Sequence, residues 1–63
     1  MKDTVFLKNL FDSALDNHKK KNFNEAEKLY KEIIKKKPND LKSNFYLGTL
    51  YLQNKNYKEA KNI

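Results

Sequence analysis

Residues 22–26, with the sequence Asn-Phe-Asn-Glu-Ala, recur as Asn-Tyr-Lys-Glu-Ala at residues 56–60. The two stretches lie 34 residues apart, and sliding the chain by 34 pairs residues 1–29 with residues 35–63. Eight of these pairs are identical, whereas about three identities would be expected from a composition this rich in Lys and Asn. The chain therefore contains an internal repeat of 34 residues, and this repeat decides the fold.

Apolar residues in each unit follow the spacing of an α-helix. In the first segment they recur at i, i+3, i+4 and i+7, at Leu7, Leu10, Phe11, Ala14 and Leu15. A second helix is predicted to begin at Phe23, after a capping box formed by Asn22 and Glu25. Pro38 disfavours helical geometry at the residue before it and so ends this helix. A third helix follows Asp40, which is its predicted cap.

These patterns predict an all-α fold of antiparallel helix-turn-helix repeats, forming a single domain over residues 1–63. About four helices are expected, the first capped by Asp3 or Thr4 and the last one truncated. The first repeat is assigned to residues 7–40 and a partial second repeat to residues 41–63. Both turns within the repeats carry a lysine, Lys21 and Lys55, which would cost about 1 to 2 kcal/mol each if left-handed.

Length and composition exclude several classes of protein. A chain of 63 residues buries too little surface to house a deep catalytic cleft beside a core. It has no Cys, so disulfides, thiolate nucleophiles and Cys-based zinc sites are excluded. The apolar run before Lys8 is too short for a signal peptide or a membrane span, and a cytoplasmic location is expected.

The chain resembles the tetratricopeptide repeat family. The family pattern Trp-x2-Leu-Gly-x2-Tyr is matched from Asn44 to Tyr51, with Asn in place of Trp, and its Ala-x3-Phe pattern is matched by Ala26 and Tyr30, followed by Pro38. The first unit departs from the family pattern, since it has Ser-Ala where Leu-Gly is expected. First repeats are often atypical because one side has no neighbour.

The resemblance implies a protein interaction module that binds a partner in a concave groove lined by the first helix of each repeat. The groove positions carried over from the family are Lys8, Phe11, Asp12, Leu15, Lys42, Phe45, Tyr46 and Thr49. Their aromatic and aliphatic side chains favour an apolar partner helix or extended segment, with lysines at the rim. Phe11 and Leu15 are equally compatible with positions in the core.

No constellation of catalytic residues is found, so no enzymatic activity, cofactor, metal or small-molecule substrate is expected. His18 has no accompanying nucleophile or second histidine, which favours a structural role. The lysines at 19–21 and 35–37 are interpreted as helix-end residues. Binding of nucleic acid or anionic membrane through them is the less favoured interpretation.

Two further alternatives remain open. The repeats could form the N-terminal part of a larger glycosyl-, methyl- or sulfotransferase and present its substrate. The chain could also self-associate through the third helix, because a truncated fourth helix would leave its apolar residues exposed, namely Leu47, Leu50, Tyr51 and Leu52.

Small residues are predicted to lie at the helix contacts, with Ala14 facing Ala26 and Gly48 facing Ala60. We therefore expect Ala26→Leu to overpack the first hairpin and to lower the free energy of unfolding by about 1 to 3 kcal/mol. Thermal melting followed by circular dichroism measures this loss. A melting curve that matches that of the parent chain would contradict the assigned packing.

Overall fold

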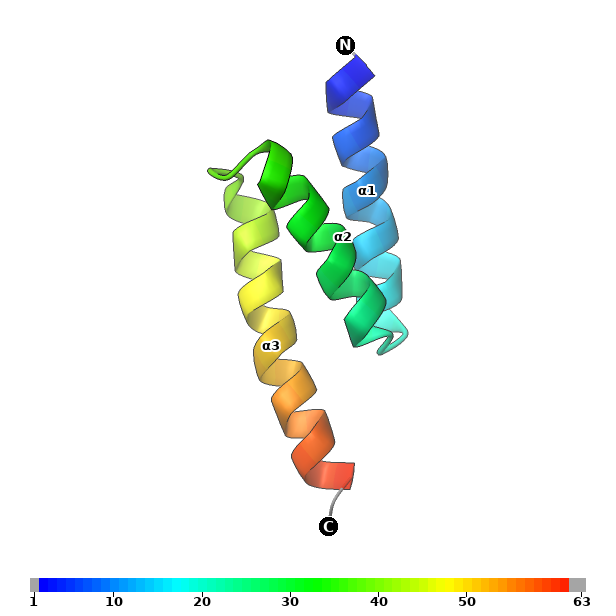
Figure 1. Ribbon diagram of the computed structural model, residues 1–63. Coiled ribbons are helices and arrows are strands. Elements are labelled where there is room, and N and C mark those ends of the chain that lie inside the picture. Colours follow the sequence, from blue (N-terminus) through cyan, green and yellow to red (C-terminus); the bar gives the residue numbers. More distant parts are fainter. Residues whose placement is uncertain (1, 62–63) are drawn as a thin grey trace.

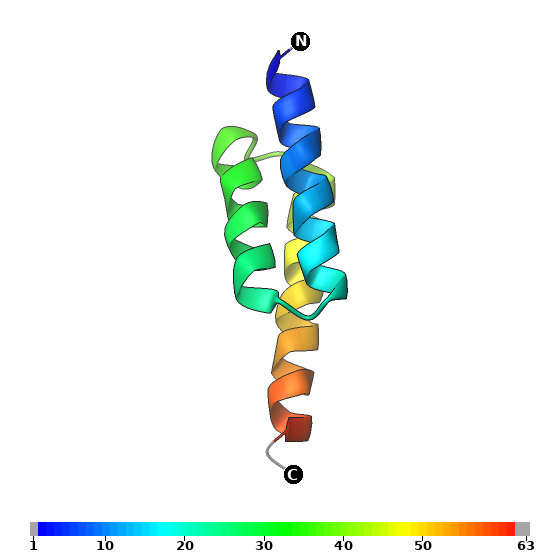
Figure 2. The ribbon, with the colours of Figure 1, turned by 90° about the vertical axis from the view of Figure 1, so that its right-hand side faces the viewer.

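The computed structural model describes residues 2–61, with side chains from residue 5 to residue 60. It consists of α1 (Lys2–Lys19), α2 (Phe23–Lys36) and α3 (Leu41–Lys61), and the described part contains no strand. Successive helices run antiparallel, with α2 between the other two in Figure 1. Figure 2 shows α1 and α3 on the same side of α2. Within residues 2–61 no helix is long and apolar enough to span a lipid bilayer.

The turn between α1 and α2 adopts the strained backbone expected from the sequence. Lys21 has a φ of 65°, in the left-handed region that costs a side-chain-bearing residue about 1 to 2 kcal/mol. The backbone N–H of Lys21 donates to the carbonyl of His18 at 3.1 Å, and that of Asn22 donates to the carbonyl of Asn17 at 2.8 Å. These two bonds satisfy carbonyl groups at the end of α1 and so partly offset the strain.

The predicted starts of the first two helices need correction. α1 already includes Lys2, so Asp3 and Thr4 lie inside its first turn rather than ahead of it. Asn22 does precede α2, but its side chain makes no capping hydrogen bond. Its amide instead donates to the side-chain oxygen of Asn17 at 3.3 Å, because the left-handed turn brings these two side chains together. The predicted capping box is therefore wrong.

The start of α3 is capped as the sequence predicts. The carboxylate of Asp40 accepts hydrogen bonds from the backbone N–H and the hydroxyl of Ser43, at 3.2 and 2.5 Å. The Asp40 carbonyl accepts from the backbone N–H of Asn44 at 3.1 Å. The Ser43 side chain is fully buried, so its hydroxyl needs this partner.

The expectation of about four helices is wrong, because α3 continues to Lys61 without a turn at Lys55. The first unit turns at Lys21 because four residues after the turn are buried, namely Phe23, Ala26, Tyr30 and Ile33. After Lys55 the corresponding described residues are Tyr57 and Ala60, and both remain exposed. A helix that continues gains a backbone hydrogen bond per residue and avoids the left-handed strain, so α3 extends past the other helices (Figure 1).

The core lies where α2 contacts both of its neighbours. Its buried residues are Ala14, Phe23, Ala26, Tyr30 and Leu50. The full burial of Ala14 and Ala26 agrees with the predicted small-residue contact between α1 and α2. Leu50 is also fully buried, so the expectation that it is exposed is wrong, whereas Tyr51 and Leu52 are exposed as expected.

The predicted contact between Gly48 and Ala60 does not form. Both residues belong to the continuous α3, about 18 Å apart along its axis at 1.5 Å per residue. A Cβ added to Gly48 would meet no atom within 4 Å. Gly48 therefore faces open space, and no close contact with the described residues offsets its poor helix propensity.

This open space gives a direct test of the three-helix fold. We expect Gly48→Ala to raise the free energy of unfolding by about 1 kcal/mol, since Ala favours a helix interior and no atom obstructs its methyl group. Urea denaturation followed by circular dichroism measures the change. Ala60→Leu is the matched variant and should leave stability nearly unchanged, because Ala60 is exposed. Destabilisation by both substitutions would indicate that α3 bends back on itself.

Candidate partner-binding face

The side chain of Tyr30 on α2 joins the two helices that carry the predicted groove. Its ring centroid lies 6.1 Å from that of Phe11 on α1 and 6.3 Å from that of Tyr46 on α3, and the ring is stacked with Tyr46 at an interplanar angle of 11°. Tyr30 is fully buried, and this burial raises the pKa of its hydroxyl to about 12. The hydroxyl is therefore neutral at physiological pH and can act as a hydrogen-bond donor.

His18 completes this connection between the helices. Its Nδ1 lies 3.0 Å from the Tyr30 hydroxyl and its Nε2 lies 2.5 Å from Oε1 of Gln53. An amide oxygen can only accept, so Nε2 carries the proton and donates to Gln53. In the neutral ring, Nδ1 then accepts from Tyr30. These contacts connect α1, α2 and α3, and they support the structural role predicted for His18.

Four of the eight predicted groove residues come together beside Tyr30. The ring centroids of Phe11 and Tyr46 are 5.4 Å apart in an edge-on arrangement, and those of Phe45 and Tyr46 are 5.5 Å apart. Together with Leu41 and Lys42, these rings line a shallow depression of about 400 Å³. We call this surface the aromatic face, formed by Phe11, Leu41, Lys42, Phe45 and Tyr46.

Two large apolar side chains of the aromatic face are mostly exposed to solvent. Leu41 is 83% exposed and Phe45 is 69% exposed. Phe11 and Tyr46 are half-buried and pack against the core. Phe11 is thus both a core contact and part of the face, which accounts for the two interpretations that its position in the sequence allowed.

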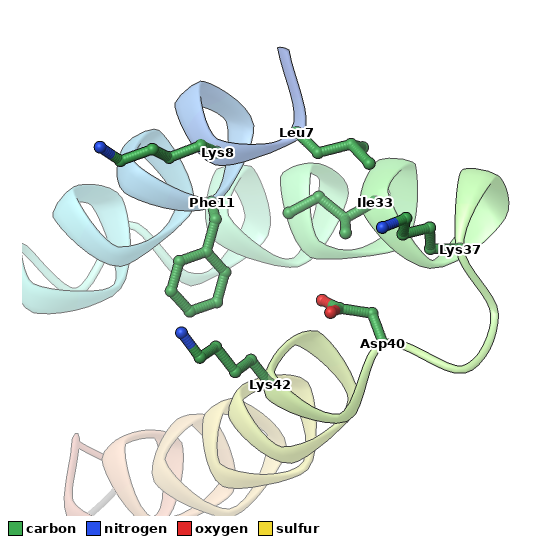
Figure 3. Close-up of a pocket in the computed structure, with 7 residues that line it drawn as sticks. All are labelled: Leu7, Lys8, Phe11, Ile33, Lys37, Asp40 and Lys42. Carbon is green, nitrogen blue, oxygen red and sulfur yellow. The ribbon is translucent and has the colours of Figure 1, made fainter. Parts of the chain in front are cut away.

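A second depression, which we call the junction hollow, lies where α1, the end of α2 and the start of α3 meet (Figure 3). It has a volume of about 270 Å³. Its lining residues are Leu7, Lys8, Phe11, Ile33, Lys37, Asp40 and Lys42. Phe11 and Lys42 line both depressions, so the junction hollow and the aromatic face are continuous.

The remaining predicted groove residues lie outside both depressions. Asp12 is exposed on α1, and Leu15 is half-buried. The hydroxyl of Thr49 donates to the carbonyl of Phe45 at 3.1 Å, so it is used within α3. Four residues of the junction hollow, Leu7, Ile33, Lys37 and Asp40, are not among the groove positions expected from the sequence. Only Leu7 carried a signal, because it is identical to Leu41 in the 34-residue alignment.

A second polar contact fixes α3 against α2. The hydroxyl of Tyr51 donates to the Glu27 carboxylate at 2.9 Å, and Lys31 forms an ion pair with the same carboxylate at 2.9 Å. The hydrogen bond from Lys31, followed by that from Tyr51, lowers the pKa of Glu27 below its ordinary value of 4.5. This contact joins the middle of α3 to α2.

The remaining acidic groups and the lysine runs lie apart from the two depressions or at helix ends. Among the described residues, no three His, Asp or Glu side chains are grouped so that they could hold a metal ion. The two lysine runs fall at the ends of α1 and α2, and the backbone N–H of Lys37 donates to the carbonyl of Ile33 at 2.7 Å. Their location agrees with the helix-end interpretation.

Comparison with known families supports the repeat identified in the sequence. A family model described as tetratricopeptide repeat matches residues 17–63, which is most of the chain. A search of curated proteins found no match, and a search of solved structures found none either. The match begins near the end of α1, so the atypical first helix lies largely outside it.

The contact between Tyr51 and Glu27 predicts a specific pH dependence. Because the pKa of Glu27 is lower in the folded chain than in the unfolded chain, its charge stabilises the fold above the unfolded pKa, and this contribution is lost as the pH falls through the folded pKa. Tyr51→Phe should raise the pKa of Glu27, which a ¹³C NMR titration of its carboxyl carbon measures. Tyr46→Phe is the control and should leave that pKa unchanged. An unchanged pKa in Tyr51→Phe would show that α3 is not held there.

Proposed function

Since the chain belongs to the tetratricopeptide repeat family, we propose that it is a non-catalytic module that binds a segment of a partner protein on its aromatic face. The observation that carries this proposal is the exposure of Phe45 and Leu41 beside the partly buried rings of Phe11 and Tyr46. Aromatic anchors next to a depression are the usual energetic centres of protein interfaces.

The geometry favours a partner segment over a small molecule. The aromatic face is shallow and open, whereas sites for small molecules enclose most of the ligand surface. Two of its rings, Phe11 on α1 and Tyr46 on α3, pack against the buried ring of Tyr30. A face that is already ordered loses little conformational freedom when a partner binds, which favours affinity.

A peptide selection tests this function. The immobilised chain is used to select binders from a displayed library of random peptides, and the affinities of the selected peptides are compared between the parent chain and Phe45→Ser. We expect the substitution to weaken binding about tenfold or more, as for a residue at the centre of an interface. Because Phe45 is 69% exposed, its replacement should leave helicity nearly unchanged.

Lys28→Ala provides the matched control. Lys28 is exposed on α2 and lines neither depression, so the selected peptides should bind this variant as tightly as the parent chain. Peptides that bind Phe45→Ser and the parent chain equally well would contradict the proposed face.

A further inference from the structure

We propose that the junction hollow receives an apolar side chain of the partner segment, and that carboxylates flank this side chain in the partner. The proposal rests on the function proposed above and specifies the chemistry of the partner. It concerns residues beyond the groove positions expected from the sequence, since Leu7, Ile33 and Lys37 come from the start of α1 and the end of α2.

The walls of the hollow are apolar and suited to one side chain. Leu7 and Phe11 on α1 are half-buried, and Ile33 on α2 is buried, with 2% of its surface exposed. The volume of about 270 Å³ falls below the range of about 300 to 1,000 Å³ typical of small-molecule sites. A leucine or phenylalanine side chain would bury apolar surface there without moving the helices.

The residues that line the hollow carry a net positive charge, since Lys8, Lys37 and Lys42 outnumber Asp40. Figure 3 shows the Asp40 carboxylate between the ammonium groups of Lys37 and Lys42, while Lys8 points away from them. None of these lysines belongs to an ion pair of the described chain, where the ion pairs join Lys20 to Asp16 and Lys31 to Glu27. The Asp40 carboxylate is held by its two hydrogen bonds from Ser43.

The charge of the chain favours an acidic partner segment over a second copy of the chain. The chain has a formal net charge of +6, so a second copy would bring further positive charge to a rim that already contains free lysines. An acidic partner instead satisfies Lys37 and Lys42 and is attracted over a distance of about 8 Å at physiological salt. Charge complementarity therefore favours an acidic segment.

The hollow does not depend on the exposed end of α3. Its lining residues all lie between Leu7 and Lys42, in the part of the chain that the core and the Asp40 cap hold in place. A bend in α3 after Gln53 would leave these residues where they are.

Three capped peptides test the proposal by NMR titration of the ¹⁵N-labelled chain. Their sequences are Glu-Glu-Leu-Glu-Glu, Gln-Gln-Leu-Gln-Gln and Glu-Glu-Ser-Glu-Glu. The first should shift the backbone amides of Leu7, Ile33 and Lys37 and should bind at least about fivefold more tightly than either of the others. Equal affinity for the first and second peptides, or for the first and third, would overturn the proposal.

Charge-neutralised variants test whether the lysines at the rim contribute to peptide binding. Replacing both lysines, as Lys37→Gln with Lys42→Gln, should weaken binding of the first peptide about three- to tenfold, in line with two exposed ion pairs. Lys28→Gln with Lys35→Gln removes the same charge from α2 outside the hollow and should change the affinity less than twofold. Circular dichroism of each variant confirms that the helices are retained.

Different experimental results would contradict the proposed partner-binding face and the proposed occupant of the junction hollow. If selected peptides depend on Phe45 while the acidic leucine peptide leaves the amides of the hollow unshifted, the partner-binding face stands and the hollow proposal is wrong. If no selected peptide depends on Phe45, the proposed face itself is wrong. Dilution shifts of the same amides in peptide-free samples would show a second copy in the hollow and would also overturn the acidic-partner proposal.

Discussion

The arrangement of the three helices depends on the burial of one tyrosine. Tyr30 contacts Phe11 and His18 on α1 and Tyr46 on α3, with ring centroids 5.9 to 6.3 Å apart. A buried hydroxyl is costly unless it has a partner, and His18 provides that partner at 3.0 Å. Because α1 and α3 pack mainly on α2, Tyr30 determines how the two outer helices lie relative to one another. The aromatic face and the junction hollow both follow from that placement.

The same constraint explains why one part of α3 is well held and the rest is not. Near Tyr30 the helix has a capped start at Asp40, a buried Leu50 and the bond from Tyr51 to Glu27. Residues 55–60 are all exposed, although Tyr57 still contacts the ring of Phe23. The apolar surface of α3 therefore has two origins. Phe45 is exposed beside ordered aromatic rings, whereas Leu52 is exposed because no helix covers it.

The sequence correctly predicted features that depend on residues close together in the chain or on the 34-residue repeat. Asp40 precedes a helix and caps it, Lys21 takes the left-handed turn, and Ala26 is buried as the 34-residue repeat requires. The absence of a turn at Lys55 could not be predicted in this way, because the same Lys-Asn pair forms a turn only where a buried face follows it. The place of Ile33 and Asp40 in the junction hollow could not be predicted for a related reason, since they line one depression with Leu7 only after the helices have packed.

The most direct test of the account is an NMR measurement of nuclear Overhauser effects between aromatic ring protons in the isotope-labelled chain. The structure predicts cross-peaks from the Tyr30 ring to the rings of both Phe11 and Tyr46, since their centroids lie about 6 Å apart and their ring edges lie closer. Cross-peaks to Phe11 alone would show that α3 is not fixed against the first hairpin. The aromatic face and the junction hollow would then not exist as ordered surfaces in solution, and the account would be contradicted.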